Sequence, residues 1–547
     1  MREMTGGEAV YETLRAIGVE HVFGIVSVHN IPIYDAILRG GGITPVAMRH
    51  EQAAAHAADG YARATGKLGV VIASTGPGTT NAVSGLYEAG FASSRVLLIT
   101  GQVDTTYYGK GKGFLHEAEH QLAMLRTVTR AAESVRRTED IADTIVRVAR
   151  DVQLGRPQPG AVEIPIDLQY AKAAVDIPHV EAWARMQPAQ GAIQQAVDAL
   201  NGATRRVIWA GGGVINADAA AELTQLAEKL DAPVFTSING RGAIPEDHPL
   251  CMGPLANDPH MERTLAEAEV VLAVGTRFQA GATRNWTLQL PGKLVHVDAD
   301  PGVIGRNYPP AVSVVGDARL SLAAILRNVD SSPGDAAFLD AACEARDAAR
   351  AAIRQQIGPD YEAIMDTMRE LLPREANIVR DATVPAYLWG NRLLPIYEPR
   401  TSLSPTSAAI GPALPLAIGA ALGSSRKTAV IQGDGGFMLS IGELATAAQY
   451  RAPVIVCIFN DRGYGVLRTI QARTFEGRQA GVDLATPDFA AVAAAMGVRG
   501  EAVRGVAAFR DAFARAVDAD GPVLLDIDMA SLQPMGGLGS PPPKRAG

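Results

Sequence analysis

The sequence predicts an α/β protein made of three doubly wound domains, each built on a parallel sheet. Short apolar runs typical of buried strands alternate along the chain with longer segments that suit helices. Glycine-rich turns follow several of these runs, as is common where a strand leads into a helix. The length of 547 residues also fits about three domains.

The first domain is expected over residues 1–180. It opens with a helix predicted at residues 7–17. Apolar runs then predict buried strands at residues 68–73, 96–100 and 160–167. A linker that contains prolines, at residues 177–188, separates this domain from the next.

The middle domain, expected over residues 188–330, is predicted to be Rossmann-like. Its strand at residues 206–210 runs into a glycine-rich turn at residues 211–216. Asn216 stands where the dinucleotide fingerprint requires Gly or Ala. The favoured interpretation is therefore a tight strand-to-helix turn in a structural domain.

The third domain is expected over residues 355–533, after an alanine-rich helix predicted at residues 335–356. Two apolar runs in it, at residues 428–431 and 453–459, predict buried strands, and the segment between them suits one crossover helix. The remaining residues, 534–547, include a proline run and are expected to form a loose or interface-covering tail.

Asp434 and Asp461 are the most informative pair of residues, because each follows one of these two strands. Asp434 lies within a glycine-rich turn, and Asp461 follows Asn460. A right-handed crossover makes the two strands parallel, so both aspartates are expected at the carboxyl edge of the sheet, where α/β sheets bind ligands.

Two carboxylates at one edge repel each other unless a cation lies between them, and oxygen ligands suit Mg²⁺ or Ca²⁺. Glycine amides at the start of a helix suit a phosphate group. The pair therefore predicts a site for a metal-bridged diphosphate. The alternative is that each segment is an ordinary turn, which would be the better interpretation of either one alone.

The sequence of residues 433–435, followed one strand later by Asn460 and Asp461, resembles the metal-diphosphate signature of thiamine diphosphate-dependent enzymes. Asp461 departs from the usual Asn-Asn ending: it keeps an oxygen ligand but adds a negative charge. The resemblance implies the thiamine diphosphate-binding fold, with thiamine diphosphate and Mg²⁺ as cofactors. It also implies that Asp434, Asp461 and the carbonyl of Gly463 bind the metal.

Three further segments extend the resemblance over nearly the whole chain: residues 49–63, 74–81 and 408–415. In the first, Glu51 would be the glutamate that activates the cofactor. In the last, Ile410 would be the apolar wedge that bends the cofactor, and the carbonyl of Ala408 would accept a hydrogen bond from its amino group. The residues expected to bind the cofactor are Thr75, Gly76, Thr383, Ala408, Ile410, Gly433, Gly435, Gly436 and Tyr464.

The family's chemistry explains why Glu51 matters. The protein supplies binding, orientation and electrostatics to a cofactor that carries out the bond chemistry. A glutamate bonded to the pyrimidine ring favours the tautomer that takes the proton from the reactive carbon. The alternative is an exposed glutamate at a helix start, which the helix dipole favours.

Residues near the substrate are assigned by the same resemblance. His29 and His116 are expected to act in catalysis, because each falls on a loop that the family uses for it, although a lone histidine is more often structural. The residues expected to line the substrate site are Val28, Tyr387, Val466, Leu467 and Ile470.

The order of motifs is most similar to acetolactate synthases, but three features differ. The first-strand turn lacks a glycine pair, Ile470 replaces a tryptophan, and paired aspartates after Phe278 are missing, which leaves a structural FAD uncertain. His29 and Tyr387 instead resemble residues of benzaldehyde lyase, and the third domain is similar to benzoylformate decarboxylase.

The expected function is therefore that of a carboligase or lyase that forms or cleaves carbon–carbon bonds of 2-oxo acids, aldehydes or 2-hydroxy ketones through an enamine intermediate. A 2-oxo acid decarboxylase of the benzoylformate decarboxylase type is an alternative. A 2-hydroxyacyl-CoA lyase is less favoured, since no basic cluster for a nucleotide stands out. Outside enzymes, the alternative is a catalytically silent regulatory paralogue.

Composition and the absence of targeting patterns predict the compartment and the binding partners of the protein. A net charge of −8 and the lack of a basic aromatic cluster argue against a nucleic-acid partner. The three cysteines lie far apart and predict buried thiols in a reducing compartment. No signal peptide or membrane span is predicted, so a cytoplasmic enzyme with a small-molecule substrate is expected. The resemblance implies a homodimer or homotetramer with shared active sites.

Overall fold

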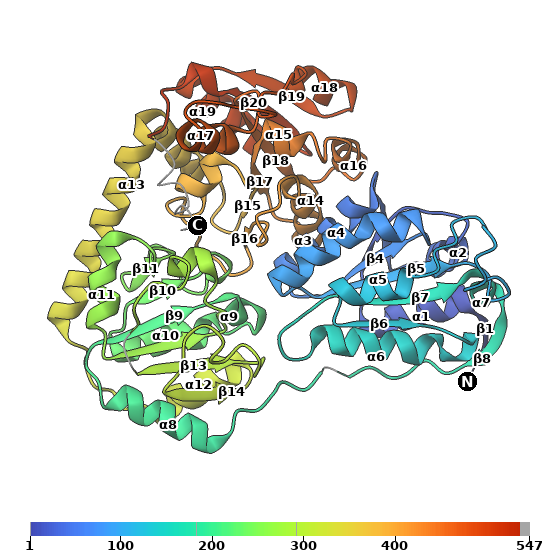
Figure 1. The fold of residues 1–547 in the computed structure, drawn as a ribbon, viewed down its shortest axis with the longest axis horizontal. Helices are drawn as coiled ribbons and strands as arrows, with labels where there is room; N and C mark the ends of the chain where they lie inside the picture. The colour runs from blue at the N-terminus through green and yellow to red at the C-terminus, as the bar shows by residue number, and fades with distance from the viewer. Residues whose placement is uncertain (1, 182, 291–292, 537–547) are drawn as a thin grey trace.

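Three six-stranded parallel sheets organise the computed structural model, which describes residues 2–181, 183–290 and 293–536 (Figure 1). The sheets lie within residues 21–165, 206–315 and 377–528. Three parallel-sheet α/β domains confirm the predicted fold class. The domain bounds given above stay predictions, and residues 537–547 of the predicted tail lie outside the described residues.

The sheet of the N-terminal domain has the order β3-β2-β4-β5-β7-β6. Its strands are β2 (His21–Gly24), β3 (Thr44–Ala47), β4 (Gly69–Ala73), β5 (Val96–Gln102), β6 (Ala131–Ser134) and β7 (Gly160–Pro165). Its helices are α1 (Gly6–Ile17), α2 (Ile31–Gly40), α3 (Glu51–Thr65), α4 (Pro77–Ala92), α5 (Gln121–Val128), α6 (Ile141–Gln153) and α7 (Ile166–Tyr170). Antiparallel pairing of β1 (Arg2–Thr5) with β8 (Lys172–Val175) closes the domain.

The sheet of the middle domain has the order β11-β10-β9-β12-β13-β14. Its strands are β9 (Arg206–Ala210), β10 (Val234–Thr236), β11 (Cys251–Gly253), β12 (Val270–Val274), β13 (Leu294–Asp298) and β14 (Val312–Val315). Its helices are α8 (Gln190–Asn201), α9 (Gly212–Asn216), α10 (Ala220–Leu230), α11 (Glu262–Glu267) and α12 (Ala318–Asn328). The glycine turn before α9 is tight, as predicted, because a Cβ on Gly211 would lie 2.1 Å from the carbonyl oxygen of Gly275.

The sheet of the C-terminal domain has the order β16-β15-β17-β18-β20-β19. Its strands are β15 (Asn377–Arg380), β16 (Ser402–Leu403), β17 (Thr428–Gly433), β18 (Val454–Asn460), β19 (Arg499–Val503) and β20 (Val523–Asp528). Its helices are α14 (Ala413–Ser424), α15 (Asp434–Phe437), α16 (Glu443–Gln449), α17 (Gly465–Thr474), α18 (Phe489–Ala495) and α19 (Gly505–Val517). The long helix α13 (Ala336–Leu371) leads into this domain from the middle one (Figure 1).

Two helices differ from the sequence prediction. Helix α13 continues to Leu371 instead of ending at residue 356, with a break at Gly358, whose φ is +79°, followed by Pro359. The crossover between β17 and β18 is two short helices, α15 and α16, rather than one. Between β17 and β18 the apolar spacing continues through the interruption, so periodicity predicts one helix there. At α13 the predicted end lies two residues before Gly358, and the helix resumes after the break.

Helices α3 and α14 join the N-terminal and C-terminal domains at close range. A Cβ on Gly60 would lie 2.0 Å from the carbonyl oxygen of Leu416, and one on Gly419 would lie 1.8 Å from that of Ala57. Only glycine permits this approach. The contact fixes how Glu51, the first residue of α3, lies relative to the C-terminal sheet. Within the described residues, every helix is too short or too polar to cross a bilayer.

Candidate functional site

Asp434 and Asp461 lie at the carboxyl edge of the C-terminal sheet. Strands β17 and β18 are parallel, and Gly433 pairs with Phe459 at their ends. Asp434 begins α15 directly after β17, and Asp461 follows the last residue of β18. The crossover therefore places the two carboxylates where the sequence predicted them.

The Asp434 carboxylate is only partly satisfied. The side chain is fully buried, and Oδ2 accepts a hydrogen bond from the Gly463 amide at 2.8 Å. Oδ1 has no hydrogen-bond partner among the described residues. Burial and the adjacent negative charge of Asp461 raise the pKa of Asp434 to about 6. A buried oxygen of this kind, next to a second carboxylate, fits a divalent cation.

Burial also raises the pKa of Asp461, while the Arg468 guanidinium opposes that rise. Arg468 Nη1 lies 3.3 Å from Asp461 Oδ2. A second contact joins Arg468 to Asp483 at 3.0 Å. The extra charge that Asp461 brings to the family's pattern is thus paired with a cation from α17.

Close packing within the chain requires the glycines beside Asp434. A Cβ on Gly435 would lie 2.6 Å from the Tyr464 ring, and one on Gly436 would lie 2.9 Å from Asp381 Oδ2. They border a pocket of about 190 Å³, which also contains Thr383, Ala408, Ile410, Asp461, Gly463, Val466 and Leu467. Most of the residues expected to bind metal and cofactor are therefore brought together, and their arrangement fits a metal-bound diphosphate. Ile470 does not line this pocket.

The segment before α14 has an unusual backbone. Ala408 has φ of +64°, which L-residues with a Cβ seldom adopt, and Gly411 has φ of +100°. Ile410 is 39% exposed beside the pocket. The buried carboxylate of Asp381, which no sequence motif indicates, accepts hydrogen bonds from the Gly411 amide at 2.9 Å and from Gln432 at 2.6 Å.

Glu51 lies in the N-terminal domain at the start of α3. It is half-buried rather than exposed, and Asn81 Nδ2 donates to its Oε2 at 3.0 Å. From the C-terminal domain, Glu443 Oε1 accepts from the amides of Arg49 and His50 at 3.1 and 3.2 Å. Glu443 thus fixes the backbone next to Glu51, a contact between domains that sequence periodicity does not reveal.

His29 and His116 come together, with ring centroids 5.1 Å apart. Burial and the nearby His116 lower the pKa of His29, whose Nδ1 has no partner in the described part of the chain. Ser74 Oγ lies 3.3 Å from His116 Nδ1 and accepts from Ser27 Oγ at 2.7 Å. Two adjacent imidazoles of this kind can exchange protons with a bound molecule.

The other N-terminal residues have different surroundings. Thr75 is fully buried and its hydroxyl donates to Gln121 at 3.0 Å. Gly76 has φ of +59°, and a Cβ there would lie 2.6 Å from the His116 carbonyl oxygen. Val28 is 53% exposed. Of the described residues that line the diphosphate pocket, all belong to the C-terminal domain, so Glu51 and both histidines lie apart from it in one chain.

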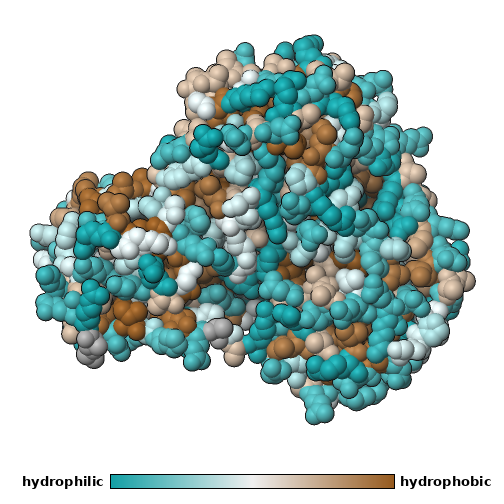
Figure 2. Space-filling model, turned by 180° about the vertical axis from the view of Figure 1, so that it is seen from behind, coloured by the Kyte–Doolittle hydropathy of each residue, from teal (hydrophilic) through white to brown (hydrophobic). Residues whose placement is uncertain are grey.

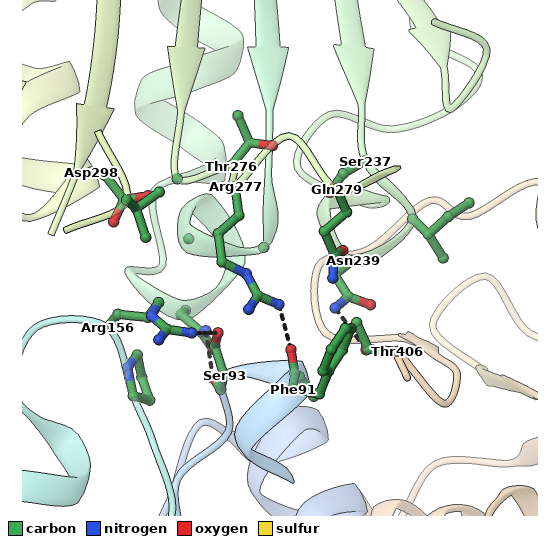
Figure 3. A pocket seen from close by; sticks show the side chains of 18 of the residues that line it. Phe91, Ser93, Arg156, Ser237, Asn239, Thr276, Arg277, Gln279, Asp298 and Thr406 are labelled. Carbon is green, nitrogen blue, oxygen red and sulfur yellow. Dashed lines mark hydrogen bonds between the residues drawn. The ribbon is translucent and has the colours of Figure 1, made fainter. Parts of the chain in front are cut away.

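A second cavity, of about 1320 Å³, lies where the three domains meet (Figure 3). Six arginines from distant parts of the chain line it: Arg95, Arg156, Arg185, Arg277, Arg306 and Arg392. Only the fold brings these arginines together, and three of them are paired with carboxylates: Arg156 with Asp300, Arg185 with Asp317 and Arg392 with Asp258. The expectation that no basic cluster for a nucleotide stands out in the sequence stays a prediction. Tyr387, expected near the substrate, lines both this cavity and the smaller pocket.

The side chains in the cavity include groups that could hold a polar ligand. Arg277 donates to the Phe91 carbonyl, and burial lowers its pKa to about 10. Arg156 Nη1 donates to Ser93 Oγ at 3.1 Å (Figure 3). Burial raises the pKa of Asp298 to about 6. Thr236 is 2% exposed, and its hydroxyl has no partner among the residues described.

Comparison with protein families gives three matches in order along the chain. Residues 4–124 match the model described as thiamine pyrophosphate enzyme, N-terminal TPP binding domain. Residues 193–325 match the central domain of the same enzymes, and residues 385–527 match their C-terminal TPP binding domain.

Curated relatives span almost the whole chain. A probable 2-ketoarginine decarboxylase of Pseudomonas aeruginosa is 37% identical, over 91% of this chain and 89% of that protein. A probable acetolactate synthase large subunit of Methanocaldococcus jannaschii is 32% identical, over 97% and 93%. The acetolactate synthase isozyme 3 large subunit of Escherichia coli is 32% identical, over 91% and 89%.

Proposed function

The chain belongs to the thiamine pyrophosphate enzyme family, and from this membership we propose that it forms or cleaves carbon–carbon bonds next to a carbonyl group. Its proposed substrates are 2-oxo acids, aldehydes and 2-hydroxy ketones. The matches confirm the predicted thiamine diphosphate-dependent enzyme of transferase or lyase type. The substrates, the site residues and the assembly are the parts that we propose.

The observation that carries the proposal is the edge formed by Asp434 and Asp461. A buried, unpartnered carboxylate oxygen, a second carboxylate and two bare glycines meet there. Asp434, Asp461 and the Gly463 carbonyl would hold Mg²⁺, and the amides at the start of α15 would hold the diphosphate. When bound, thiamine diphosphate supplies a carbon that adds to carbonyl groups and stabilises negative charge.

The chain's own residues orient the reacting groups and move protons. Glu51 would hold a proton at the ring nitrogen of the pyrimidine, and the Ala408 carbonyl would accept from its amino group. Ile410 would support the bent shape of the cofactor. His29 and His116 would donate and accept protons at the substrate oxygen, since their rings are adjacent.

We propose that two chains share each active site in a homodimer or homotetramer. In a single chain Glu51 lies outside the diphosphate pocket, so a second chain would supply that residue. Large apolar side chains are exposed in both domains that the site needs, and Figure 2 shows hydrophobic residues gathered on the N-terminal domain, at the left. The exposed apolar side chains of the two domains include Val26, Val28, Tyr87, Met438, Leu439 and Leu467.

Decarboxylation of a 2-oxo acid is the second candidate function. It is favoured by the 37% identity to a probable 2-ketoarginine decarboxylase, against 32% to the acetolactate synthases cited above. Both reactions require the same activated cofactor, and they differ in whether a proton or a second carbonyl compound ends the cycle. The part of the site that would bind the second carbonyl compound therefore decides between decarboxylation and carboligation.

We further propose that the inter-domain cavity binds a molecule with a nucleotide diphosphate, either FAD or the nucleotide part of an acyl-CoA substrate. Its volume exceeds that of most small-ligand pockets, and its arginines suit phosphate groups. Acid denaturation of the purified protein, followed by absorption spectra of the supernatant, distinguishes the two. Released flavin supports the first, and stabilisation of a colourless protein by CoA supports the second.

The test of the proposed function is product analysis with a panel of 2-oxo acids, aldehydes and 2-hydroxy ketones, in the presence of Mg²⁺ and thiamine diphosphate. Coupled products identify a carboligase, aldehydes and CO₂ identify a decarboxylase, and cleaved hydroxy ketones identify a lyase. Cofactor binding without turnover of any panel member would contradict the proposal and favour a silent regulatory paralogue. A cytoplasmic location stays a prediction.

A further inference from the structure

The segment at residues 404–411, here called the wedge segment, is held by side chains of all three domains. It contains Ala408 and Ile410, the residues proposed to bind and bend the cofactor, so the inference below rests on the proposed function. Two of the side chains that hold it come from the N-terminal domain, one from the middle domain and one from the C-terminal domain.

Glu88 of α4 binds the wedge segment from the N-terminal domain. Its side chain is 1% exposed. The carboxylate accepts from the Thr406 amide at 2.5 Å, from the Ser407 amide at 3.1 Å and from the Ser407 hydroxyl. A buried carboxylate is costly unless it is bonded in this way, and charge-assisted hydrogen bonds are the strong ones. Because Ser407 directly precedes Ala408, Glu88 fixes the backbone next to the carbonyl proposed to meet the cofactor.

Other side chains support the same stretch. Arg63 Nη1 donates to the Ser404 carbonyl at 3.0 Å, and Arg63 is itself 3.6 Å from the buried Asp59. From the middle domain, Asn239 Nδ2 donates to Thr406 Oγ1 at 3.0 Å (Figure 3). Side chains of the two other domains thus fix the part of the wedge segment before Ala408. Asp381 fixes the part after Ala408.

The conformation of Ala408 explains why such support is required. A φ of +64° costs an L-residue with a Cβ roughly 1–2 kcal/mol. Strained residues persist only where their surroundings determine the backbone strongly. The Glu88 contacts lie within two residues of Ala408 and provide that constraint.

Helix α4 also contacts the other half of the catalytic machinery. Asn81, near its start, donates to Glu51, and Glu88 lies two turns further along the same helix. One rigid element therefore touches both the activating glutamate and the wedge segment of its own chain.

We propose that Glu88 is a positioning residue that sets the wedge segment for cofactor binding, although it does not line the diphosphate pocket. It acts through the backbone of residues 406 and 407 on the direction of the Ala408 carbonyl. Loss of its negative charge weakens the contacts with both amides and lets the strained backbone relax. The affinity for thiamine diphosphate then falls even where the fold is retained.

The test is the variant Glu88→Gln, which keeps the size of the side chain and removes its charge. Binding of thiamine diphosphate with Mg²⁺ is measured by fluorescence titration, and thermal unfolding of the cofactor-free protein is measured in parallel. The proposal predicts a Kd raised on the order of tenfold or more, as expected for lost charge-assisted hydrogen bonds. A Kd within about twofold of the wild-type value would overturn the proposal, whatever the unfolding midpoint.

Two further variants complete the test. Glu12→Gln changes a partly exposed glutamate of α1, whose ion pair with Arg2 is 3.5 Å long, and its Kd is expected to equal the wild-type value. Ser407→Ala removes one of the three hydrogen bonds to Glu88 and is expected to raise the Kd several-fold. If Glu88→Gln does not fold, an unchanged Kd in Ser407→Ala overturns the proposal.

The readout also separates this proposal from the proposed function. Wild-type protein that binds thiamine diphosphate but converts none of the panel substrates would contradict the proposed reactions. The Kd comparison between Glu88→Gln and the wild type would remain decisive for Glu88.

Discussion

Asp461 puts a second negative charge beside Asp434, and Arg468 is the residue that compensates for it. The guanidinium of Arg468 lies 3.3 Å from the Asp461 carboxylate and also contacts Asp483. A motif comparison identifies the added charge but not its partner. Arg468 is seen to pair with Asp461 only in the folded chain, where α17 lies against the end of β18. Arg468 thus balances the charge that Asp461 adds, and the edge remains the proposed metal site.

Ala408 is strained, and its replacement by glycine tests that strain. Relief of a positive φ gains roughly 1–2 kcal/mol, and the extra freedom of the unfolded chain costs about 0.5–1 kcal/mol. We therefore expect Ala408→Gly to raise the thermal unfolding midpoint slightly, by a few degrees at most. Ala409 is not among the residues with positive φ, so Ala409→Gly should lower the midpoint. A lower midpoint in Ala408→Gly would contradict the strain.

Asp381 gives the pH dependence of stability a predictable sign. Burial raises its pKa from 3.8 to about 6, although hydrogen bonds from Ala382, Gly411 and Gln432 oppose the rise. Between about pH 4 and pH 6 the folded chain holds a proton at Asp381 that the unfolded chain releases. Stability from this group therefore falls as the pH rises through that window and is constant above it.

The variant Asp381→Asn has no such proton. Between pH 4 and pH 6 the wild-type protein should lose stability relative to the variant. The difference in their free energies of unfolding should decrease by on the order of 3 kcal/mol at most, and the difference in their thermal midpoints should decrease with it. Differential scanning measurements at fixed salt provide the comparison. Parallel profiles for the two proteins would show that Asp381 does not titrate in this range.

At the scale of elements, the packing of α3 on α14 joins the N-terminal and C-terminal domains of one chain. Gly419→Ala tests it, because the added Cβ would meet the Ala57 carbonyl oxygen at 1.8 Å. We expect a loss of about 1–3 kcal/mol in stability from overpacking. Gly191 of α8 has open space around its Cβ position, so Gly191→Ala should be neutral or stabilising by up to about 1 kcal/mol. Thermal unfolding of both variants checks the contrast, and equal effects would refute the packing argument.

Elements could be predicted from the sequence where the pattern is local. The strands before Asp434 and Asp461 are continuous apolar runs, and their parallel crossover follows from general chain geometry. The resumption of α13 after Gly358 could not be predicted, because a Gly-Pro pair marks the end of a helix but not whether another follows. The division of the crossover helix into α15 and α16 was not predicted either, since apolar spacing continues between them. Glu88 and Glu443 could not be predicted because their partners lie more than 300 residues away in the sequence.

At the scale of the whole molecule, the inter-domain cavity could not be predicted, since its arginines come from all three domains. No local charge run marks them. The fold is also what shows that Glu51 and the diphosphate pocket are separate in one chain. Glu51 and the residues of the diphosphate pocket are candidates from the sequence, and their roles stay predictions. The sequence does not show that they lie apart in one chain.

Shared active sites predict complementation between two inactive variants. In a mixed dimer of Glu51→Gln and Asp434→Ala chains, one of the two sites combines an intact Glu51 with an intact Asp434. We expect the refolded mixture to recover activity on the order of a quarter of the wild-type value, because about half of the dimers are mixed by random assembly. Activity that stays at the level of the separate variants would contradict sharing between chains.

The most direct test is the binding of thiamine diphosphate and Mg²⁺ to the Asp434→Ala protein, measured by titration calorimetry beside the wild type. We expect the variant to keep its fold and to lose measurable affinity for the cofactor and the metal, because the buried carboxylate proposed to hold the metal is gone. Wild-type affinity in the folded variant would contradict the assignment of this sheet edge as the cofactor site.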